Sequence, residues 1–231
     1  ISYKVSAEGE INDLDDAEMI QMAKEYGVAP LMMLEALSIN MEDEINVIHS
    51  ILTSQQKQER LINNLLHTLE ARGYSGVNIN TPYIQPTDRG LYEDFIIEVY
   101  DRLSKAGYKV YNTFTIRVFQ LLSGTIFTGI DYSKLSKDVD GVILITFGYG
   151  YTEGIPPGTL SLDTFKRFFE LMSSSIPPEK TFAGFSVIGY IWTFPYIPGE
   201  SRGMSVSYDS ALRAAAVNNA EIKFDETTNT A

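Results

Sequence analysis

Carboxylate and amide side chains that could take part in catalysis or binding lie in or beside segments where apolar residues alternate along the chain. This alternation is typical of β-strands. Asn78 and Asn80 are two positions apart in one such segment, so they share a face and could hydrogen-bond ligand hydroxyl groups or satisfy one another. Glu35 lies near the end of an earlier segment, and Glu153 follows a later one. A carboxylate in either place could act as a general acid, although most such residues are simply solvated.

Aromatic residues form a second group of candidates, because their flat faces can stack on a ligand. The aromatic residues close to predicted strand ends are Tyr83, Tyr149, Tyr151, Tyr190, Trp192, Phe194 and Tyr196. The alternative is that these rings fill the core. Trp192 is the only tryptophan of the chain and is the first candidate for ligand contact.

Composition excludes several other functions. The chain of 231 residues has no cysteine and only two histidines, so neither a Cys nucleophile nor a His-rich metal site is expected. His49 and His67 lie in helical patterns and are interpreted as surface or packing residues. A net charge of −12 disfavours binding to nucleic acid and to anionic membranes. No apolar run approaches the roughly 20 residues that span a bilayer, and no phosphate-binding glycine motif indicates a cofactor.

The candidate residues must be positioned by strands that alternate with helices. Apolar periodicity switches repeatedly between 2 and about 3.6, which is typical of βαβ units and a largely parallel sheet. Besides an opening strand at Ile1, Tyr3 and Val5, the predicted strands are Val28 to Leu37, Gly76 to Ile84, Lys109 to Val118, Gly141 to Tyr149 and Thr181 to Trp192. The predicted helices are Asp16 to Tyr26, Met41 to Leu52, one from a Ser54 cap to Gly73, one from Thr87 to Gly107, Leu162 to Ser175 and Tyr208 to Asn218.

This spacing favours a (β/α) TIM-type barrel over a doubly wound sheet. About six strands are counted where a closed barrel has eight, so the predicted barrel is incomplete. No linker or repeat divides residues 1–231, which we therefore assign to a single domain.

Several separated segments, which follow one another in the right order, resemble glycoside hydrolase family 18. The run GYSGVNINTPYI at residues 73–84 is similar to the fourth-strand signature D-G-x-[DN]-[IL]-D-[FW]-E, and ILITFGYGY at 143–151 is similar to the sixth-strand segment. IPPEK at 176–180 and GYIWTFPY at 189–196 resemble segments of the bacterial branch of spore cortex-lytic, LysM-associated N-acetylglucosaminidases. VAPLM at 28–32 and FDET at 224–227 agree further. The resemblance implies that the chain stops inside the insertion that follows strand seven in that family, so that strands one and eight are missing.

The resemblance also implies that the catalytic groups are missing. Family 18 enzymes use the acetamido oxygen of the substrate as nucleophile, a Glu as general acid and an Asp that orients the acetamido group. The Glu position is Pro82 and the Asp position is Asn80, while the sixth-strand Tyr and its acidic neighbour are Phe147 and Gly148. The first Asp of the signature corresponds to Ser75, and its [DN] position is Asn78. Loss of a general acid costs about a hundredfold to ten-thousandfold in rate.

The leading hypothesis is therefore a catalytically inactive domain that binds or scaffolds a glycan containing N-acetylglucosamine, peptidoglycan or chitin-like, in a bacterial envelope or spore or outside the cell. The first alternative is an active N-acetylglucosaminidase whose acid has moved to Glu35 or Glu153. The second alternative is a structural protein that assembles with itself.

Missing strands would leave two unpaired sheet edges, which promote association. Because Ile1 falls inside a strand pattern, we expect a segment of a longer protein, with self-association or pairing to the missing barrel strands.

Overall fold

The structure is a computed structural model, and it describes residues 1–81, 84–115, 119–121, 124–126, 132–145, 166, 169–170, 176–184, 188–193, 195, 197, 200–224 and 226. Its chain divides into two compact units. The first comprises Ile1–Ile143 and Ser175–Phe182, and the second comprises Leu144–Ser174 and Ala183–Ala231. Assignment of both units to one domain stays a prediction.

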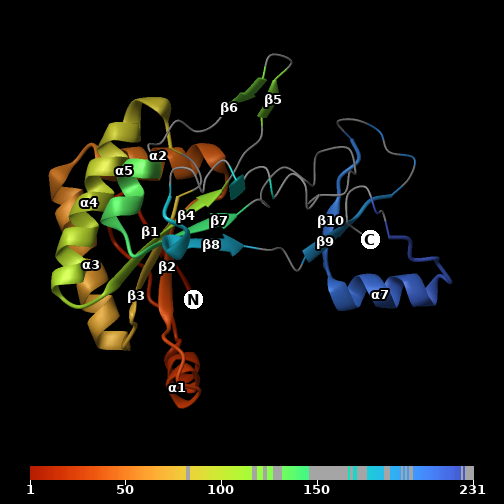
Figure 1. Cartoon of the computed structure of the whole chain (residues 1–231), viewed down its shortest axis with the longest axis horizontal. Coiled ribbons are helices and arrows are strands. Elements are labelled where there is room, and N and C mark those ends of the chain that lie inside the picture. The colour runs from red at the N-terminus through yellow and green to blue at the C-terminus, as the bar shows by residue number, and fades with distance from the viewer. Residues whose placement is uncertain are drawn as a thin grey trace. The chain divides into compact units, whose positions relative to one another are not determined.

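The first unit is built around parallel strands that alternate with helices (Figure 1). Six strands form one sheet in the order β1-β2-β3-β4-β7-β8, which confirms the predicted α/β class and the count of about six. These strands are β1 (Ser2–Val5), β2 (Leu31–Ala36), β3 (Gly76–Asn80), β4 (Lys109–Thr115), β7 (Gly141–Ile145) and β8 (Thr181–Gly184). The helices of the first unit are α1 (Ala17–Glu25), α2 (Met41–Leu52), α3 (Gln55–Arg72), α4 (Arg89–Lys105) and α5 (Tyr132–Leu135), with short 3-10 turns η1 (Pro86–Asp88), η2 (Ser136–Asp138) and η3 (Pro178–Lys180).

One face of this sheet is apolar and covered by helices. In β2 burial alternates strictly, with Met32, Leu34 and Ala36 at most 4% exposed and the residues between them half-buried. Leu65 of α3 and Ile96 of α4 are fully buried, as expected of helices that cover a sheet. Hydrophobic burial on this face therefore fixes which side chains point to the other, inner face of the sheet.

The inner face carries polar and aromatic side chains, some of them buried and others partly exposed. Tyr111 and Phe182 meet edge to face with ring centroids 5.8 Å apart. Gly141 lies between them, because a Cβ added there would come within 2.7 Å of both rings. Phe182 is 47% exposed. The inner face is thus the surface of the first unit on which a polar site can form.

Buried hydrogen bonds around Asp16 stabilise the sheet near the amino-terminal ends of its strands. The carboxylate of Asp16 is 2% exposed and accepts from Tyr3 at 2.5 Å and from Tyr74 at 2.6 Å. Burial and the bond to Asp16 raise the pKa of Tyr3 to about 12. Burial alone would raise the pKa of Asp16, but the two hydroxyl donors and Arg72 hold it below its usual range. This cluster ties the start of α1 to β1 and to Tyr74, two residues before β3.

Local signals explain most helix ends. Helix α3 ends at Gly73, which has φ +80° as predicted for a left-handed cap, and α4 ends just before Gly107 with φ +88°. Helix α3 begins directly after Ser54 as predicted, although Ser54 makes no side-chain capping bond, and α4 begins at Arg89 after η1 rather than at Thr87. Helix α2 is capped instead by Asn40, whose side chain accepts from the Asp43 amide at 2.9 Å.

The second unit corrects the last predicted strand. Thr181 to Trp192 is not one strand, because β8 ends at Gly184 and β9 (Ile188–Ile191) pairs antiparallel with β10 (Met204–Ser207) in a separate sheet. Helix α7 (Tyr208–Val217) agrees with the helix predicted at Tyr208 to Asn218, whereas β10 before it was not predicted. The hairpin of β5 (Phe119–Leu121) and β6 (Gly124–Ile126) and the short helix α5 were not predicted. Of the predicted helix 162–175, only residues 166, 169 and 170 are described.

The outer edge of β1 is not left unpaired, contrary to expectation. Ile11 forms an antiparallel bridge with Val5, and the Asn12 amide donates to the Lys4 carbonyl at 3.0 Å. The Lys4 amide in turn donates to the Asn12 side chain at 2.5 Å. The chain therefore folds back along β1 and satisfies backbone groups that would otherwise promote association at this edge.

Candidate functional site

A row of polar side chains crosses the inner face near the carboxyl ends of four neighbouring strands. Lys4 of β1 is in register with Glu35 of β2, and Asn80 of β3 is in register with Thr113 of β4. Paired residues of parallel strands point to the same face, and hydrophobic burial has already assigned the opposite face to the helices. The row Lys4, Glu35, Asn80 and Thr113 is the candidate site of the first unit.

Glu35 is the centre of this row. Its Oε2 accepts from Lys4 Nζ and from Ser2 Oγ, both at 2.5 Å, and its Oε1 accepts from Asn80 Nδ2 at 2.8 Å. The Glu35 side chain is 24% exposed and that of Lys4 is 42% exposed, so the ion pair is partly shielded from solvent. Both carboxylate oxygens thus have partners.

The charge state of Glu35 follows from these contacts. Burial alone would raise the pKa of the carboxyl, but the hydrogen bonds from Lys4 and Ser2 and the charge of Lys4 lower it below its usual range. Glu35 is therefore ionised near neutral pH. A general acid needs a proton to give and a pKa near the working pH, so Glu35 is poorly suited to the role of a relocated acid.

The two asparagines of β3 differ in their hydrogen bonding. Asn78 is 7% exposed, and its Oδ1 accepts from Thr113 Oγ1 at 2.9 Å, so it is satisfied by a neighbouring strand. Asn80 donates to Glu35, while its Oδ1 is buried without a hydrogen-bond partner among the described residues. Of the two, Asn80 is the amide whose oxygen has no hydrogen-bond partner among the described residues.

Ser75 does not join this row. It precedes β3, and its amide donates to the Pro30 carbonyl at 2.9 Å while its carbonyl accepts from the Lys109 amide at 3.0 Å. These contacts lie at the amino-terminal ends of β2, β3 and β4. Ser75 is thus at the opposite end of the strand from Asn80, as the length of β3 requires.

Trp192 belongs to the second unit and follows β9. A Cβ added to Gly203 would come within 2.7 Å of indole atoms Cε2 and Nε1, so the chain at Gly203 packs against the ring. The residue is half-buried. Part of the indole is therefore occupied by the protein itself, and a role in sugar stacking stays a prediction.

Several candidate residues lie outside the described part of the chain. These are Pro82, Tyr83, Phe147, Gly148, Tyr149, Tyr151, Glu153, Phe194 and Tyr196. For Tyr190 the backbone is described in β9, opposite Ser205 of β10, but the side chain is not. The predicted roles of all these side chains stay predictions.

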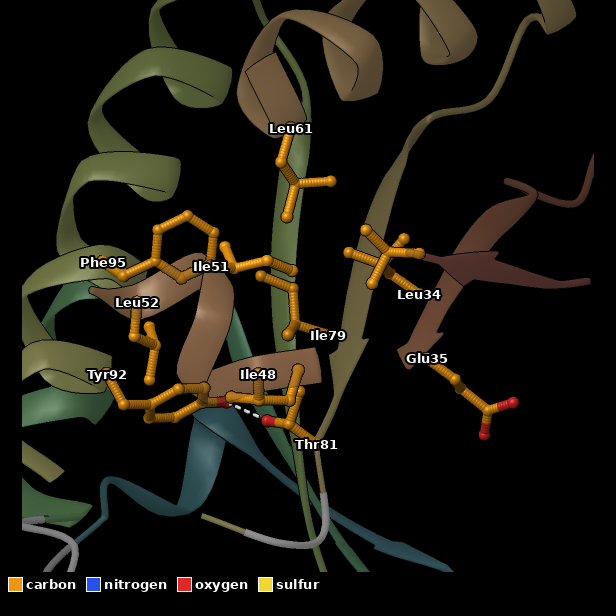
Figure 2. Close-up of a pocket in the computed structure, with 11 residues that line it drawn as sticks. Leu34, Glu35, Ile48, Ile51, Leu52, Leu61, Ile79, Thr81, Tyr92 and Phe95 are labelled. Carbon is orange, nitrogen blue, oxygen red and sulfur yellow. Dashed lines mark hydrogen bonds between the residues drawn. The ribbon is translucent and has the colours of Figure 1, made fainter. Parts of the chain in front are cut away.

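A pocket is found on the other face of the sheet, between β1 to β3 and helices α2 to α4. Figure 2 shows its mostly apolar lining and the hydrogen bond from Thr81 to Tyr92, which measures 2.7 Å. The carboxylate of Glu35 points away from the apolar side chains in the same view (Figure 2). With room of about 20 Å³, close to one water molecule, this pocket is a gap in helix–sheet packing rather than a sugar site.

Two sets of polar contacts were missed by the sequence interpretation. Lys4 and Ser2 alternate with the buried Tyr3 and Val5, and this alternation could have placed them on the inner face beside Glu35. His49 contacts Asp88 through Nδ1 and Oδ2 at 2.8 Å, where the Asp88 side chain is 5% exposed. No short-range signal predicts that pair, because the residues are 39 positions apart.

Within the described ranges, no group of three His, Asp or Glu side chains is arranged to hold a metal ion. Among the described helices, none combines the length and apolar character needed to cross a bilayer.

Comparison with known proteins gives a consistent relationship. No family model matches the chain. It is 27% identical over 185 residues to a cortical fragment-lytic enzyme of Bacillus subtilis, and the aligned region covers 80% of this chain and 42% of the relative. It superposes on the spore cortex-lytic enzyme SleL of Bacillus cereus with TM-score 0.87 at 23% identity, covering 99% of this chain and 52% of that one. It superposes on a chitinase from Chromobacterium violaceum with TM-score 0.82 at 17% identity, and the match covers 98% of this chain and 70% of the chitinase chain.

These matches confirm a fold like that of glycoside hydrolase family 18 and a relationship to spore cortex-lytic glycosylases. The chain spans about half the length of the curated relatives it matches.

Proposed function

We propose that this chain is a glycan-binding domain with a family 18-like fold that holds a sugar polymer without cleaving it. The proposal depends on one observation above all: where the family resemblance puts two carboxyl groups, the chain has Asn80 and Pro82. Neither an amide nor a proline has an ionisable group that could transfer a proton to a leaving oxygen. The described carboxylate beside Asn80 is Glu35, which is ionised and has one oxygen paired with Lys4 and Ser2 and the other paired with Asn80.

The polymer that we propose contains N-acetylglucosamine, as in peptidoglycan or chitin. Relatives of this chain are named for lysis of spore cortex, and a solved structure with the same fold is a chitinase. A bacterial spore or envelope is the corresponding setting. Asn80 supplies a neutral acceptor on the inner face, and Trp192 is the aromatic residue that we propose for stacking on a sugar.

The experiment measures the binding of chitin oligomers and of cortex peptidoglycan fragments to the chain. Binding is detected by calorimetry and by the fluorescence of the single tryptophan. We expect saturable binding that Trp192→Ala weakens by about 1–3 kcal/mol, the usual loss of an aromatic anchor. Tyr208→Ala is the matched control, because Tyr208 is an aromatic residue of the second unit that is 68% exposed on α7. Absence of binding at millimolar glycan would favour a purely structural role, in which the chain assembles with itself.

A further inference from the structure

The amide of Asn80 has a defined orientation. Its Nδ2 lies 2.8 Å from Glu35 Oε1, and an ionised carboxylate only accepts hydrogen bonds. The nitrogen must therefore face Glu35, and the oxygen must face away from it. Because an amide carries its donor and its acceptor on opposite branches, fixing one branch also fixes the other.

Lys4 and Ser2 hold the carboxylate in this arrangement. Both donate to Oε2 at 2.5 Å, which leaves Oε1 for Asn80. Among the described residues, Lys4 on β1 is the charged side chain that contacts Glu35, and the neighbour from β3 is the neutral Asn80. Each contact comes from an adjacent strand, so the sheet register itself aligns the three side chains.

We propose that the Lys4–Glu35 ion pair is a positioning device for Asn80, which holds the amide nitrogen of Asn80 on Glu35 and leaves its acceptor oxygen for a bound sugar. The second part of this inference rests on the proposed function. The Asn80 Oδ1 atom is buried and has no partner among the described residues, and such an acceptor is costly until a donor reaches it. A sugar N–H or O–H is a donor of the right kind.

Glu35→Gln tests the positioning directly. Glutamine keeps the size of the side chain, but it can either accept from Asn80 Nδ2 or donate to Asn80 Oδ1, so the fixed orientation is lost. The matched control is Glu8→Gln, which removes the same charge from a side chain that is 62% exposed and paired with Lys57. Glu8 makes no described contact with Asn80.

The readout is the side-chain amide pair of Asn80 in nitrogen-proton correlation spectra of the whole chain, assigned by its loss in Asn80→Asp. In the wild type we expect these signals to move as Glu35 is protonated, with a midpoint below the usual glutamate value of 4.5. Glu35→Gln should displace the signals and abolish the titration, whereas Glu8→Gln should change neither. The wild-type titration decides the question even where Glu35→Gln does not fold.

The positioning role would be overturned if the amide signals of Asn80 changed neither on acidification nor in Glu35→Gln. Glycan affinity is measured separately on the same variants. Chitotriose should bind Glu35→Gln about threefold to tenfold more weakly than it binds the wild type or Glu8→Gln, which corresponds to one neutral hydrogen bond. If the wild type binds no glycan but the titration is present, the proposed function fails and the positioning role stands.

Discussion

Asn80→Asp would place a second carboxylate beside Glu35 in the inner-face row. The substitution replaces the Nδ2 donor, 2.8 Å from Glu35 Oε1, with an oxygen of the same charge as Glu35. Two unit charges about 3 Å apart repel by roughly 5–6 kcal/mol at an effective dielectric constant of about 20, which is an upper limit before the side chains relax. Separation of the two groups, or a proton shared between them, reduces this cost. Loss of the charge-assisted hydrogen bond remains, at about 1.5–3 kcal/mol.

We therefore expect Asn80→Asp to lower the free energy of unfolding by about 1.5–3 kcal/mol at neutral pH. The sign of the pH dependence follows from the repulsion, which raises the pKa of the carboxyl pair above its unfolded value. The variant is therefore closest to the wild type below about pH 4, and it loses stability as pH rises through the raised pKa. In the wild type the pKa of Glu35 is lowered, so its contribution is present at neutral pH and is lost on acidification.

Denaturant unfolding, followed by far-ultraviolet circular dichroism between about pH 4 and pH 8, measures both effects. Asn63→Asp is the control, because Asn63 is exposed on α3 and its Oδ1 accepts from Arg102 at 3.1 Å, so the added charge meets a cation. Equal stability of Asn80→Asp and Asn63→Asp across this pH range would refute the assignment of Asn80 to a contact with ionised Glu35.

Three further substitutions test other contacts. Tyr3→Phe removes a hydrogen-bond donor from the buried carboxylate of Asp16 and should lower the free energy of unfolding, measured with denaturant, by about 1.5–3 kcal/mol. In the wild type the pKa of Tyr3 is raised, so the stability that Tyr3 contributes is lost as pH rises through about 12. Gly141→Ala should cost about 1–3 kcal/mol, because its Cβ would lie 2.7 Å from two rings, whereas Gly90→Ala in α4 meets nothing within 4 Å and should be neutral or stabilising. Asn80→Asp with Pro82→Glu should not restore full glycosidase turnover, because the carboxylate introduced at position 80 would lie against Glu35; turnover like that of an active relative would contradict this.

Much of the fold could be predicted because hydrophobic periodicity and glycine caps act locally. Helix α2 has the predicted bounds, and α3 ends at Gly73 because only a residue that tolerates positive φ fits there. The strand Thr181 to Trp192 was wrong because a continuous apolar run does not reveal where a chain leaves one sheet for another. Pairing of β9 with β10 is decided by residues farther along the chain.

The candidate site was predicted only in part, and for a similar reason. The family resemblance identified Asn80 as a site residue, but the partner of Asn80 is set by sheet register. Glu35 lies 45 positions away in sequence and was interpreted as a solvated residue or a relocated acid. Its pairing with Lys4 becomes visible only when β1 and β2 are aligned, and that alignment changes its chemistry from a candidate acid to an ionised acceptor.

The measurement that tests the central claim most directly is the release of reducing ends during incubation of the chain with chitin oligosaccharides and cortex peptidoglycan fragments that it binds. The account predicts saturable binding and no reducing ends above the buffer blank, because the position of the family acid is Pro82 and Glu35 has no proton to give at neutral pH. Product release that is abolished by Glu35→Gln or by Glu153→Gln would contradict it and would establish an active hydrolase with a relocated acid.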